Sequence, residues 1–384
     1  MATTIATAAR GAAMVATEVG RAGLDRLVPG GGAVPRRADQ VTPTWLADAL
    51  GLPAGAITSV RIVDEHTGTA ARARIAVDAV PGTDVPDHLF VKLNPRSFAQ
   101  QLMMNLFDLG RREVLAYRVL GDEPPVRVPH CYVARLDERR GRSLMVFEDL
   151  SDTATFRTVV DSVTPAEAEA VVDAMADQHI VFWESPVLDP MTGRAPAANL
   201  LGDLIRRRFV GNMRGHTADL VPDDVKRKAR ILFERSADID AFWASQPQTL
   251  LHGDPHLGNL FFEGDQPGFL DWQVATSGSG IRDVAYFASV SVEPGVLRTI
   301  ERGLVDRYAA RLDAAGVAAD PEHLWNLYRA GATEMYLSAV AAAEAGERAQ
   351  PLDVTRSGVV RSTAAVEAHD SFSVLEALID GKHV

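Results

Sequence analysis

The chain has 384 residues, 47% hydrophobic and 23% charged, so it is long enough for two domains or lobes with a substantial core. Acidic residues outnumber basic ones by 51 to 39, and the formal charge of −12 argues against a broad nucleic-acid-binding surface, which is normally basic. Cys131 is the only cysteine, which excludes an intramolecular disulfide and a cysteine-rich zinc site and suits a reducing cytoplasm.

Residues 1–40 are predicted to form an N-terminal tail or arm. Its alanine-rich start is interrupted by Arg10 and Glu18, so it matches neither a signal peptide nor a membrane span. The turn-forming stretch PGGGAVPRRADQ ends the tail. No later stretch approaches about 18 uninterrupted apolar residues. We therefore expect a soluble, cytoplasmic protein without a membrane span.

Residues 41–150 are predicted to form a small sheet with one long helix. A short helix should begin at a cap formed by Thr42 or Thr44. Residues 98–120 place apolar side chains at helical spacing and predict one helix that ends at Gly121. Alternation of apolar and polar residues, bounded by turns, predicts strands within 59–66, 71–80, 88–93 and 143–150.

Residues 151–384 have mostly helical patterns. Helices are expected at 166–183, roughly 200–213, 223–243, and several times after 294. The strand-like stretch LFFEGDQPGFLDW contains a turn signal and predicts a hairpin. That hairpin would set Leu260 opposite Asp271, with Asn259 beside them. A small antiparallel sheet followed by a larger helical part predicts an α+β fold.

The segment from Leu250 to Gln273 carries the main chemical signal. Asn259 follows Asp254 by five residues, and Asp271 follows Asn259 by twelve. Amide and carboxylate oxygens are hard ligands suited to Mg²⁺. A carboxylate just upstream can orient an acceptor hydroxyl and accept its proton. This set predicts phosphoryl transfer, with Asp254 as the base and with Asn259 and Asp271 as metal ligands.

Two other interpretations of this segment remain open. Single Asp and Asn residues near a hairpin commonly cap turns. The pattern His252-x-Asp254-x-His256 also suggests a zinc-dependent hydrolase, because His and carboxylate groups suit zinc. This second alternative is disfavoured because the sequence has no further His-rich motif to complete a closed site.

Lys92 and Glu113 form a candidate pair. Lys92 lies on strand 88–93, on the face opposite Leu89, Val91 and Leu93, and could be an ordinary solvated lysine. Glu113 lies in the apolar stripe of the long helix, where burying an unpaired carboxylate would be costly. A lysine on an adjacent sheet would remove that cost, so we predict that the two side chains pair.

The loop that contains Thr67 and Gly68 joins the first two strands. Small residues allow backbone amides to approach phosphate oxygens closely. The loop is therefore a candidate phosphate contact, although an ordinary hairpin turn explains it almost as well.

The motif His-Gly-Asp-x-x-x-x-Asn at residues 252–259, followed by a hydrophobic residue and Asp271, resembles the aminoglycoside phosphotransferase and ecdysteroid-kinase-like (CHK kinase-like) families of the protein-kinase-like superfamily. The triplet Asp271-Trp272-Gln273 is more similar to the ecdysteroid-kinase-like branch. The resemblance implies a bilobal fold, with a nucleotide-binding N-lobe at 41–150 and a helical C-lobe at 151–384 that holds the catalytic loop and substrate pocket.

The resemblance also implies ATP and Mg²⁺ as cofactors and assigns several residues. Glu113 would hold Lys92 toward the ATP phosphates, and the backbone of the hinge from Glu148 to Leu150 would face adenine. The resemblance further gives His252 a structural role, places His256 near the active site, and makes Asp283 a scaffold beneath the catalytic loop.

The expected function is ATP-dependent phosphorylation of a hydroxyl on a small molecule. Residues 187–243 and the helices after 294 should line the acceptor pocket. The cluster Arg206, Arg207 and Arg208 there is a poor cradle for a polycationic antibiotic, which favours a neutral or lipophilic alcohol. The acidity of the chain leaves an aminoglycoside or macrolide possible. A pseudokinase that binds nucleotide without turnover is the alternative, against which the five predicted catalytic and nucleotide-side residues argue together.

Overall fold

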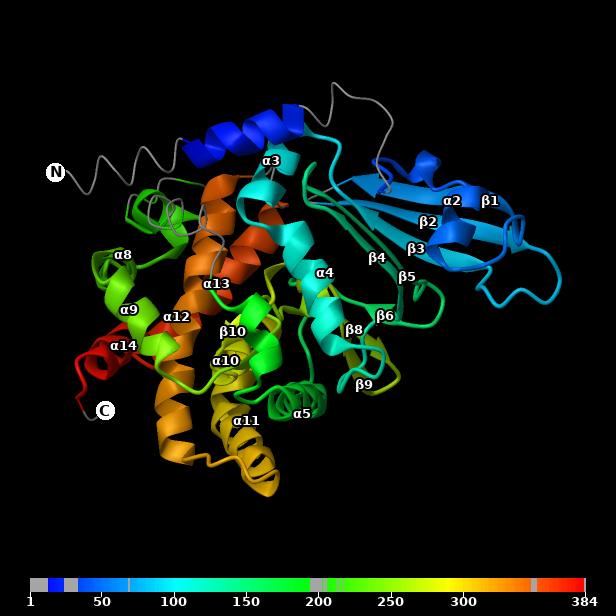
Figure 1. Cartoon of the computed structure of the whole chain (residues 1–384). Helices are drawn as coiled ribbons and strands as arrows, with labels where there is room; N and C mark the ends of the chain where they lie inside the picture. The colour runs from blue at the N-terminus through cyan, green and yellow to red at the C-terminus, as the bar shows by residue number, and fades with distance from the viewer. Residues whose placement is uncertain are drawn as a thin grey trace. The chain divides into compact units, whose positions relative to one another are not determined.

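The computed structural model describes residues 13–23, 34–67, 70–193, 202, 206–211, 213, 215, 217–346 and 351–382. The described chain divides into two compact units (Figure 1). The first runs to Glu123 and also includes Val128–Thr153, whereas the second comprises Pro124–Arg127, Ala154–Gly193 and the described residues after 201.

The first unit contains a five-stranded antiparallel sheet in the order β1-β2-β3-β5-β4. On β3, Leu89, Val91 and Leu93 are buried in the core, as their alternation predicts. The elements of this unit are η1 (Ala38–Gln40), α2 (Pro43–Ala49), β1 (Ile57–Thr67), β2 (Ala71–Ala79), β3 (His88–Leu93), α3 (Phe98–Leu106), α4 (Leu109–Leu120), β4 (Cys131–Asp137) and β5 (Arg142–Glu148), and residues 13–23 are also helical.

Helix α2 begins where the capping signal predicts. The Thr42 side chain accepts a hydrogen bond from the Trp45 backbone N–H at 3.2 Å, which selects Thr42 over Thr44 as the N-cap. Leu46 and Ala47 are buried with the sheet residues in the core of this unit. The helix that begins at this cap therefore buries Leu46 and Ala47 in the core of the unit.

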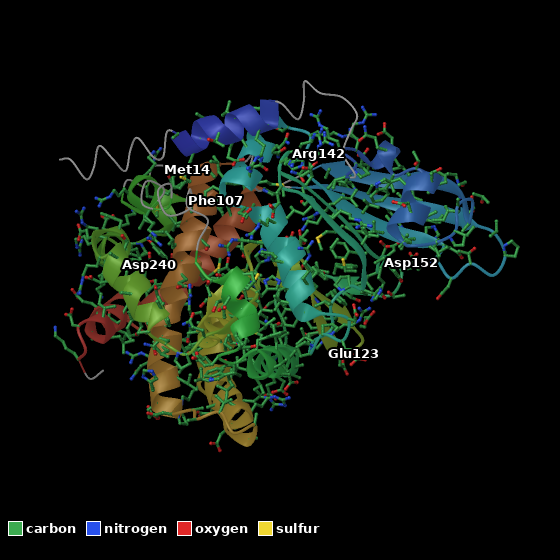
Figure 2. The ribbon with its side chains drawn as sticks, viewed as in Figure 1. Met14, Phe107, Glu123, Arg142, Asp152 and Asp240 are labelled. Atoms are coloured by element: carbon green, nitrogen blue, oxygen red, sulfur yellow. The ribbon has the colours of Figure 1, made fainter. Side chains whose placement is uncertain are left out.

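The single helix predicted over 98–120 is wrong, because two helices, α3 and α4, take its place. Phe107, labelled in Figure 2, and Asp108 separate them. Asp108 has φ 57°, in the left-handed region that Asp tolerates better than most residues. Gly110 lets α4 approach β5 closely, since a Cβ there would lie 2.3 Å from the Ser143 Oγ. The predicted stop at Gly121 is confirmed, with φ 71°.

Strand β4 has no counterpart among the predicted strands. It lies at the edge of the sheet and pairs with β5. Of its seven residues, only Val133 is fully buried. An edge strand with so few buried side chains has a weak alternating pattern, which explains why the sequence did not indicate it.

The second unit is mainly helical, and its long helix α12 packs against α10, α11, α13 and α14 (Figure 1). Its longer helices are α5 (Pro165–Val181), α10 (Ile281–Ser291), α11 (Pro294–Ala314), α12 (Pro321–Ala345), α13 (Leu352–Ala368) and α14 (Ser371–Ile379). Its shorter helices are η2 (Pro186–Met191), η3 (Arg206–Val210), η4 (Ala218–Leu220), α7 (Asp223–Lys228), α8 (Ile231–Glu234), α9 (Ser236–Ala244), η5 (Leu257–Asn259) and η6 (Trp272–Val274). Its strands are β6 (Thr155–Phe156), β7 (Thr249–Leu251), β8 (Leu260–Glu263), β9 (Gln266–Phe269) and β10 (Thr276–Gly278).

Two helical predictions for this unit need correction. The helix expected over 223–243 is divided into α7, α8 and α9, because tighter turns, such as the bond from the Leu232 N–H to the Ala229 carbonyl, interrupt it. The helix expected near 200–213 falls partly outside the described residues. Its described part is the π-helical turn η3. In the part of the chain that the structure describes, no helix combines the length and apolarity needed to cross a membrane.

The predicted hairpin forms, but its predicted register is wrong. Leu260 lies opposite Phe269 and not Asp271. The turn is the two-residue loop Gly264–Asp265, with Gly264 at φ 61°. The centre of the hairpin therefore lies one residue earlier in the chain than predicted, which moves the partner of Leu260 from Asp271 to Phe269. Taken together, the antiparallel sheets and the large helical unit confirm the predicted α+β class.

Candidate active site

The loop His252–Gly253–Asp254 directly follows strand β7. The strand pairs with β10, so the start of the loop is anchored to a two-stranded sheet. Gly253 has φ 82°, and a Cβ at this position would lie 2.7 Å from the Val274 carbonyl oxygen. Glycine is therefore required between the histidine and the aspartate.

Asp283 fixes the backbone of this loop through hydrogen bonds. The residue is buried in the first turn of α10, and its carboxylate accepts hydrogen bonds from the backbone N–H groups of His252 at 2.6 Å and Gly253 at 3.1 Å. Both oxygens are thus used to fix two successive peptide groups. This is the scaffold position that the resemblance implies for Asp283.

His252 is a buried structural residue. Its Nε2 lies 2.8 Å from the Leu270 carbonyl oxygen, and its Nδ1 lies 3.3 Å from the Asp254 backbone nitrogen. A neutral ring that donates from Nε2 and accepts at Nδ1 satisfies both contacts. Burial lowers the pKa of His252, which agrees with the neutral form.

These contacts disfavour the zinc interpretation of His252-x-Asp254-x-His256. Both ring nitrogens of His252 already contact the backbone, so neither is available as a metal ligand. Within the described ranges, no group of three or more His, Cys, Asp or Glu side chains is arranged to hold a metal ion. A closed histidine and carboxylate site therefore has no support here.

The Asp254 carboxylate is held at both of its oxygens. Oδ1 accepts a hydrogen bond from the Tyr286 hydroxyl at 2.5 Å, and Oδ2 accepts one from Asn259 Nδ2 at 3.1 Å. His256 Nε2 lies 3.5 Å from the same Oδ2. About a third of the Asp254 side chain is still exposed, at 33%. The carboxylate is thus oriented and yet accessible to a second molecule.

Tyr286 is a site residue that the sequence analysis missed. It follows Asp283 by three residues on α10, so both side chains point to the loop 252–254 from the same helix face. Burial, with the neighbouring Asp254 carboxylate, raises the pKa of Tyr286 well above its usual value, so the phenol remains a donor. The spacing from Asp283 was the one signal in the sequence that could have indicated it.

Replacing Tyr286 by phenylalanine is expected to lower kcat by about 10- to 100-fold, because a hydrogen bond to a charged group is lost. Tyr286 contacts Asp254 and is not assigned to the nucleotide, so the KM for ATP, the nucleotide that the resemblance implies, should stay within about twofold. Steady-state kinetics at saturating acceptor measure both quantities, and thermal unfolding checks the fold. An equal loss of kcat and ATP affinity would indicate a structural role alone.

Asn259 and Asp271 lie at the ends of the segments that the hairpin joins. Asn259 ends η5, and its Nδ2 also donates to the Asp254 carbonyl at 2.9 Å. The Leu270 N–H donates to the Asn259 carbonyl at 2.9 Å, which brings Asp271 next to this position despite the changed register. Asp271 has φ 64° and ψ 62°, and its Oδ1 accepts a hydrogen bond from Gln273 Nε2.

This donor set fits Mg²⁺. Mg²⁺ in phosphoryl-transfer sites is usually held by one or two carboxylates together with substrate phosphates and water. The carboxylate of Asp271 and the side-chain oxygen of Asn259 are hard oxygen ligands of this kind. The Asn259 amide, oriented by its bonds to Asp254, has its oxygen on the opposite side from those bonds.

A pocket of about 380 Å³ opens beside Asp254 within the second unit. The loop around Asp254, α10, α12 and α13 line it, as expected for the helices after 294. No described residue of 187–243 lines it, Arg206, Arg207 and Arg208 included, so the prediction that this segment contributes to the pocket is wrong for the described residues. Instead, Arg206 lies 3.8 Å from Asp240, Arg208 lies 3.6 Å from Glu344, and Arg207 lies over the Phe233 ring.

In the first unit, Lys92 and Glu113 form the predicted pair. Lys92 Nζ lies 2.7 Å from Glu113 Oε1, and the two side chains are 8% and 4% exposed. Pairing removes much of the cost of burying each charge alone. The sheet places Lys92 between β2 and β5, opposite Arg72 and Met145.

The remaining predicted nucleotide contacts also lie in the first unit. Glu148 ends β5, and its side chain accepts a hydrogen bond from the His130 N–H at 3.1 Å, whereas Leu150 is buried. Thr67 ends β1, but its side chain and all of Gly68 lie outside the described residues.

Taken together, the anchored aspartate loop, the neighbouring amide and carboxylate, and the buried lysine–glutamate pair are features of phosphotransferases with a protein-kinase-like fold. The chain belongs to the phosphotransferase enzyme family, whose family model matches residues 45–325. This match confirms the resemblance to the phosphotransferase family, and the similarity of Asp271-Trp272-Gln273 to the ecdysteroid-kinase-like branch stays a prediction. A comparison with curated proteins finds no significant match.

Several solved structures are similar to this chain. Choline kinase LicA from Streptococcus pneumoniae has a TM-score of 0.49 at 14% identity and covers 82% of this chain and 94% of its own. Plasmodium vivax ethanolamine kinase has a TM-score of 0.48 at 14% identity, with 80% and 81% covered. A choline/ethanolamine kinase family protein from Mesorhizobium loti has a TM-score of 0.48 at 14% identity, with 87% and 98% covered.

Proposed function

We propose that this protein transfers the γ-phosphoryl group of ATP to a hydroxyl of an uncharged small molecule. The observation that carries the proposal is the Asp254 carboxylate, held by Tyr286 and Asn259 at the wall of a pocket. A carboxylate oriented in this way can accept a hydrogen bond from an alcohol in the pocket. Membership of a phosphotransferase family supports the reaction class.

In the proposed reaction, Asp254 orients the acceptor hydroxyl and receives its proton. The hydroxyl oxygen forms a bond to the γ-phosphorus, the bond from that phosphorus to the β–γ bridging oxygen breaks, and ADP leaves. Because the transition state is loose, it asks little nucleophilicity of the hydroxyl, so positioning accounts for most of the work of Asp254.

The other predicted residues act on the nucleotide in this proposal. Lys92, held by Glu113, would contact the phosphates, and the backbone from Glu148 to Leu150 would contact adenine. Asn259 and Asp271 would hold Mg²⁺, which neutralises charge on the phosphates when it is bound. Thr67 and Gly68 stay candidate phosphate contacts on sequence grounds.

A pseudokinase that binds nucleotide without turnover is the second candidate. A module that only binds nucleotide needs no accessible carboxylate fixed at both oxygens. The partial exposure of Asp254 beside a pocket therefore favours turnover.

The test is a panel of uncharged alcohols incubated with the full chain, ATP and Mg²⁺. We expect acceptor-dependent release of ADP, a phosphate ester detectable by phosphorus NMR, and loss of both signals when EDTA removes the metal. ATP binding without ADP release, for every alcohol tried, would identify the pseudokinase instead.

A further inference from the structure

We infer that the pocket beside Asp254 selects an acceptor alcohol whose buried part is apolar and uncharged, and that it discriminates against cationic alcohols of the same shape. This inference rests on the proposed function, since it assigns the pocket to the acceptor. It is carried by the composition and hydrogen bonding of the pocket wall.

The wall of the pocket is built from small and aliphatic side chains. Met335, Ala339 and Ala342 come from α12, Val354 and Gly358 come from α13, and Val290 comes from α10. At Gly358, a Cβ would lie only 3.7 Å from the Ala339 Cβ, so the two helices approach closely at this point. An apolar group of the acceptor can therefore exclude water from this surface, which stabilises the complex.

The hydroxyl groups of the wall are engaged in hydrogen bonds, whereas the buried Nδ1 of the lining residue His256 has no partner among the described residues. The Thr355 hydroxyl donates to the Leu352 carbonyl at 3.0 Å, and the Ser338 hydroxyl hydrogen bonds to Tyr286, which in turn donates to Asp254. A sugar-like acceptor with many hydroxyls would have to compete for these groups. An alcohol that needs one polar contact, at Asp254, avoids that cost.

The charge of the wall gives the sharper restriction. Among the lining residues, all of which belong to the described part of the chain, Asp254 is the one carboxylate, and none is a lysine or an arginine. A cationic acceptor would lose hydration in this pocket, and its best partner would be Asp254 itself. An ammonium group paired with Asp254 occupies the position of the hydroxyl and cannot be phosphorylated.

The volume agrees with a compact buried group. Pockets that bind small molecules span roughly 300–1,000 Å³. At about 380 Å³, this pocket lies near the lower end of that range. It can take a branched or cyclic hydrocarbon group next to the reacting hydroxyl.

A matched pair of probes isolates the effect of charge. Choline and 3,3-dimethyl-1-butanol have the same shape and the same hydroxyl, and they differ in nitrogen against carbon at the branched centre. We expect the neutral alcohol to bind the wild-type chain at least about 30-fold more tightly than choline, because the cation is desolvated without a partner of its own. Saturation-transfer NMR titration measures both affinities without requiring turnover.

Substitutions in the pocket wall test whether the two probes bind in this pocket. Ala342→Asp places a carboxylate on the half-buried wall and is expected to strengthen choline binding by about tenfold and to weaken the neutral alcohol. Ala342→Asn is the neutral match and should not favour choline. Ala310→Asp, an exposed alanine on α11 outside the pocket, should leave both affinities unchanged.

Three results would overturn the inference: choline binding as tightly as the neutral alcohol, no binding of either probe, or equal responses of Ala342→Asp and Ala310→Asp. The proposed function fails in a different way. If the neutral alcohol binds with the expected preference but no alcohol is phosphorylated, the pocket assignment survives and the phosphotransferase activity does not.

Discussion

Asp254→Asn is expected to lower the phosphorylation rate by about 10²–10⁴-fold, the usual contribution of a positioned general base. Asparagine keeps the shape of the side chain but loses the negative charge and one of the two acceptor oxygens, so it orients the acceptor hydroxyl less well and cannot receive its proton. ATP affinity should change by no more than a few-fold, because Lys92 and the proposed metal ligands remain. The paired measurement is ATP affinity by titration and turnover with an accepted alcohol.

The contacts of Asp254 define the control for that variant. The single side-chain oxygen of an asparagine at 254 can accept the hydrogen bond from Tyr286 or the one from Asn259. Its amide nitrogen would then face the other donor and could not accept a hydrogen bond from it. Thermal unfolding should therefore accompany the kinetics. An inactive variant that also fails to bind ATP would point to a folding role. Undiminished turnover would move the base elsewhere, first to His256, whose Nε2 lies 3.5 Å from the Asp254 Oδ2.

Asp271→Asn is expected to reduce turnover by about 10³-fold at ordinary Mg²⁺ concentration, because the variant lacks the carboxylate that we propose as the anionic ligand of Mg²⁺. Asparagine is preferable to alanine here. Asp271 has φ 64°, a left-handed conformation that asparagine adopts readily and that costs alanine roughly 1 kcal/mol. The asparagine oxygen can also still accept the hydrogen bond from Gln273.

The dependence of turnover on Mg²⁺ separates a metal ligand from a structural residue. The Asp271→Asn variant should require a higher Mg²⁺ concentration for half-maximal rate, and added metal should restore part of its activity. Asp265→Asn, an exposed aspartate in the turn between β8 and β9, is the matched control and should behave as wild type. Wild-type turnover and an unchanged Mg²⁺ requirement in Asp271→Asn would remove Asp271 from the site.

Patterns within a short stretch of sequence were sufficient to predict the features that depend on neighbouring residues alone. Alternation along 88–93 predicted which face of β3 is buried, and the capping signal before residue 43 predicted the start of α2. The pairing of Lys92 with Glu113 was also predictable, because a carboxylate in an apolar stripe needs a cation. Spacing alone brought Asp254, Asn259 and Asp271 into one candidate site.

Other features depend on contacts between distant segments, which a single sequence does not express. The break between α3 and α4 occurs where Asp108 adopts a φ of 57°, and it lies beside Gly110, which packs closely against Ser143 on β5. The register of the hairpin depends on which residues form its turn. Because Gly264 and Asp265 form it, Leu260 pairs with Phe269 and not with Asp271, two residues further on.

The sequence by itself determined the reaction class, because the residue types that phosphoryl transfer needs, Asp254, Asn259 and Asp271, lie within one short segment of the chain. Only the tertiary structure decided what surrounds that segment. Tyr286 reaches Asp254 across 32 residues, and the pocket wall comes from α12 and α13, some 80 to 100 residues beyond the loop. Packing of α10, α12 and α13 brings these side chains together, and packing depends on the whole chain.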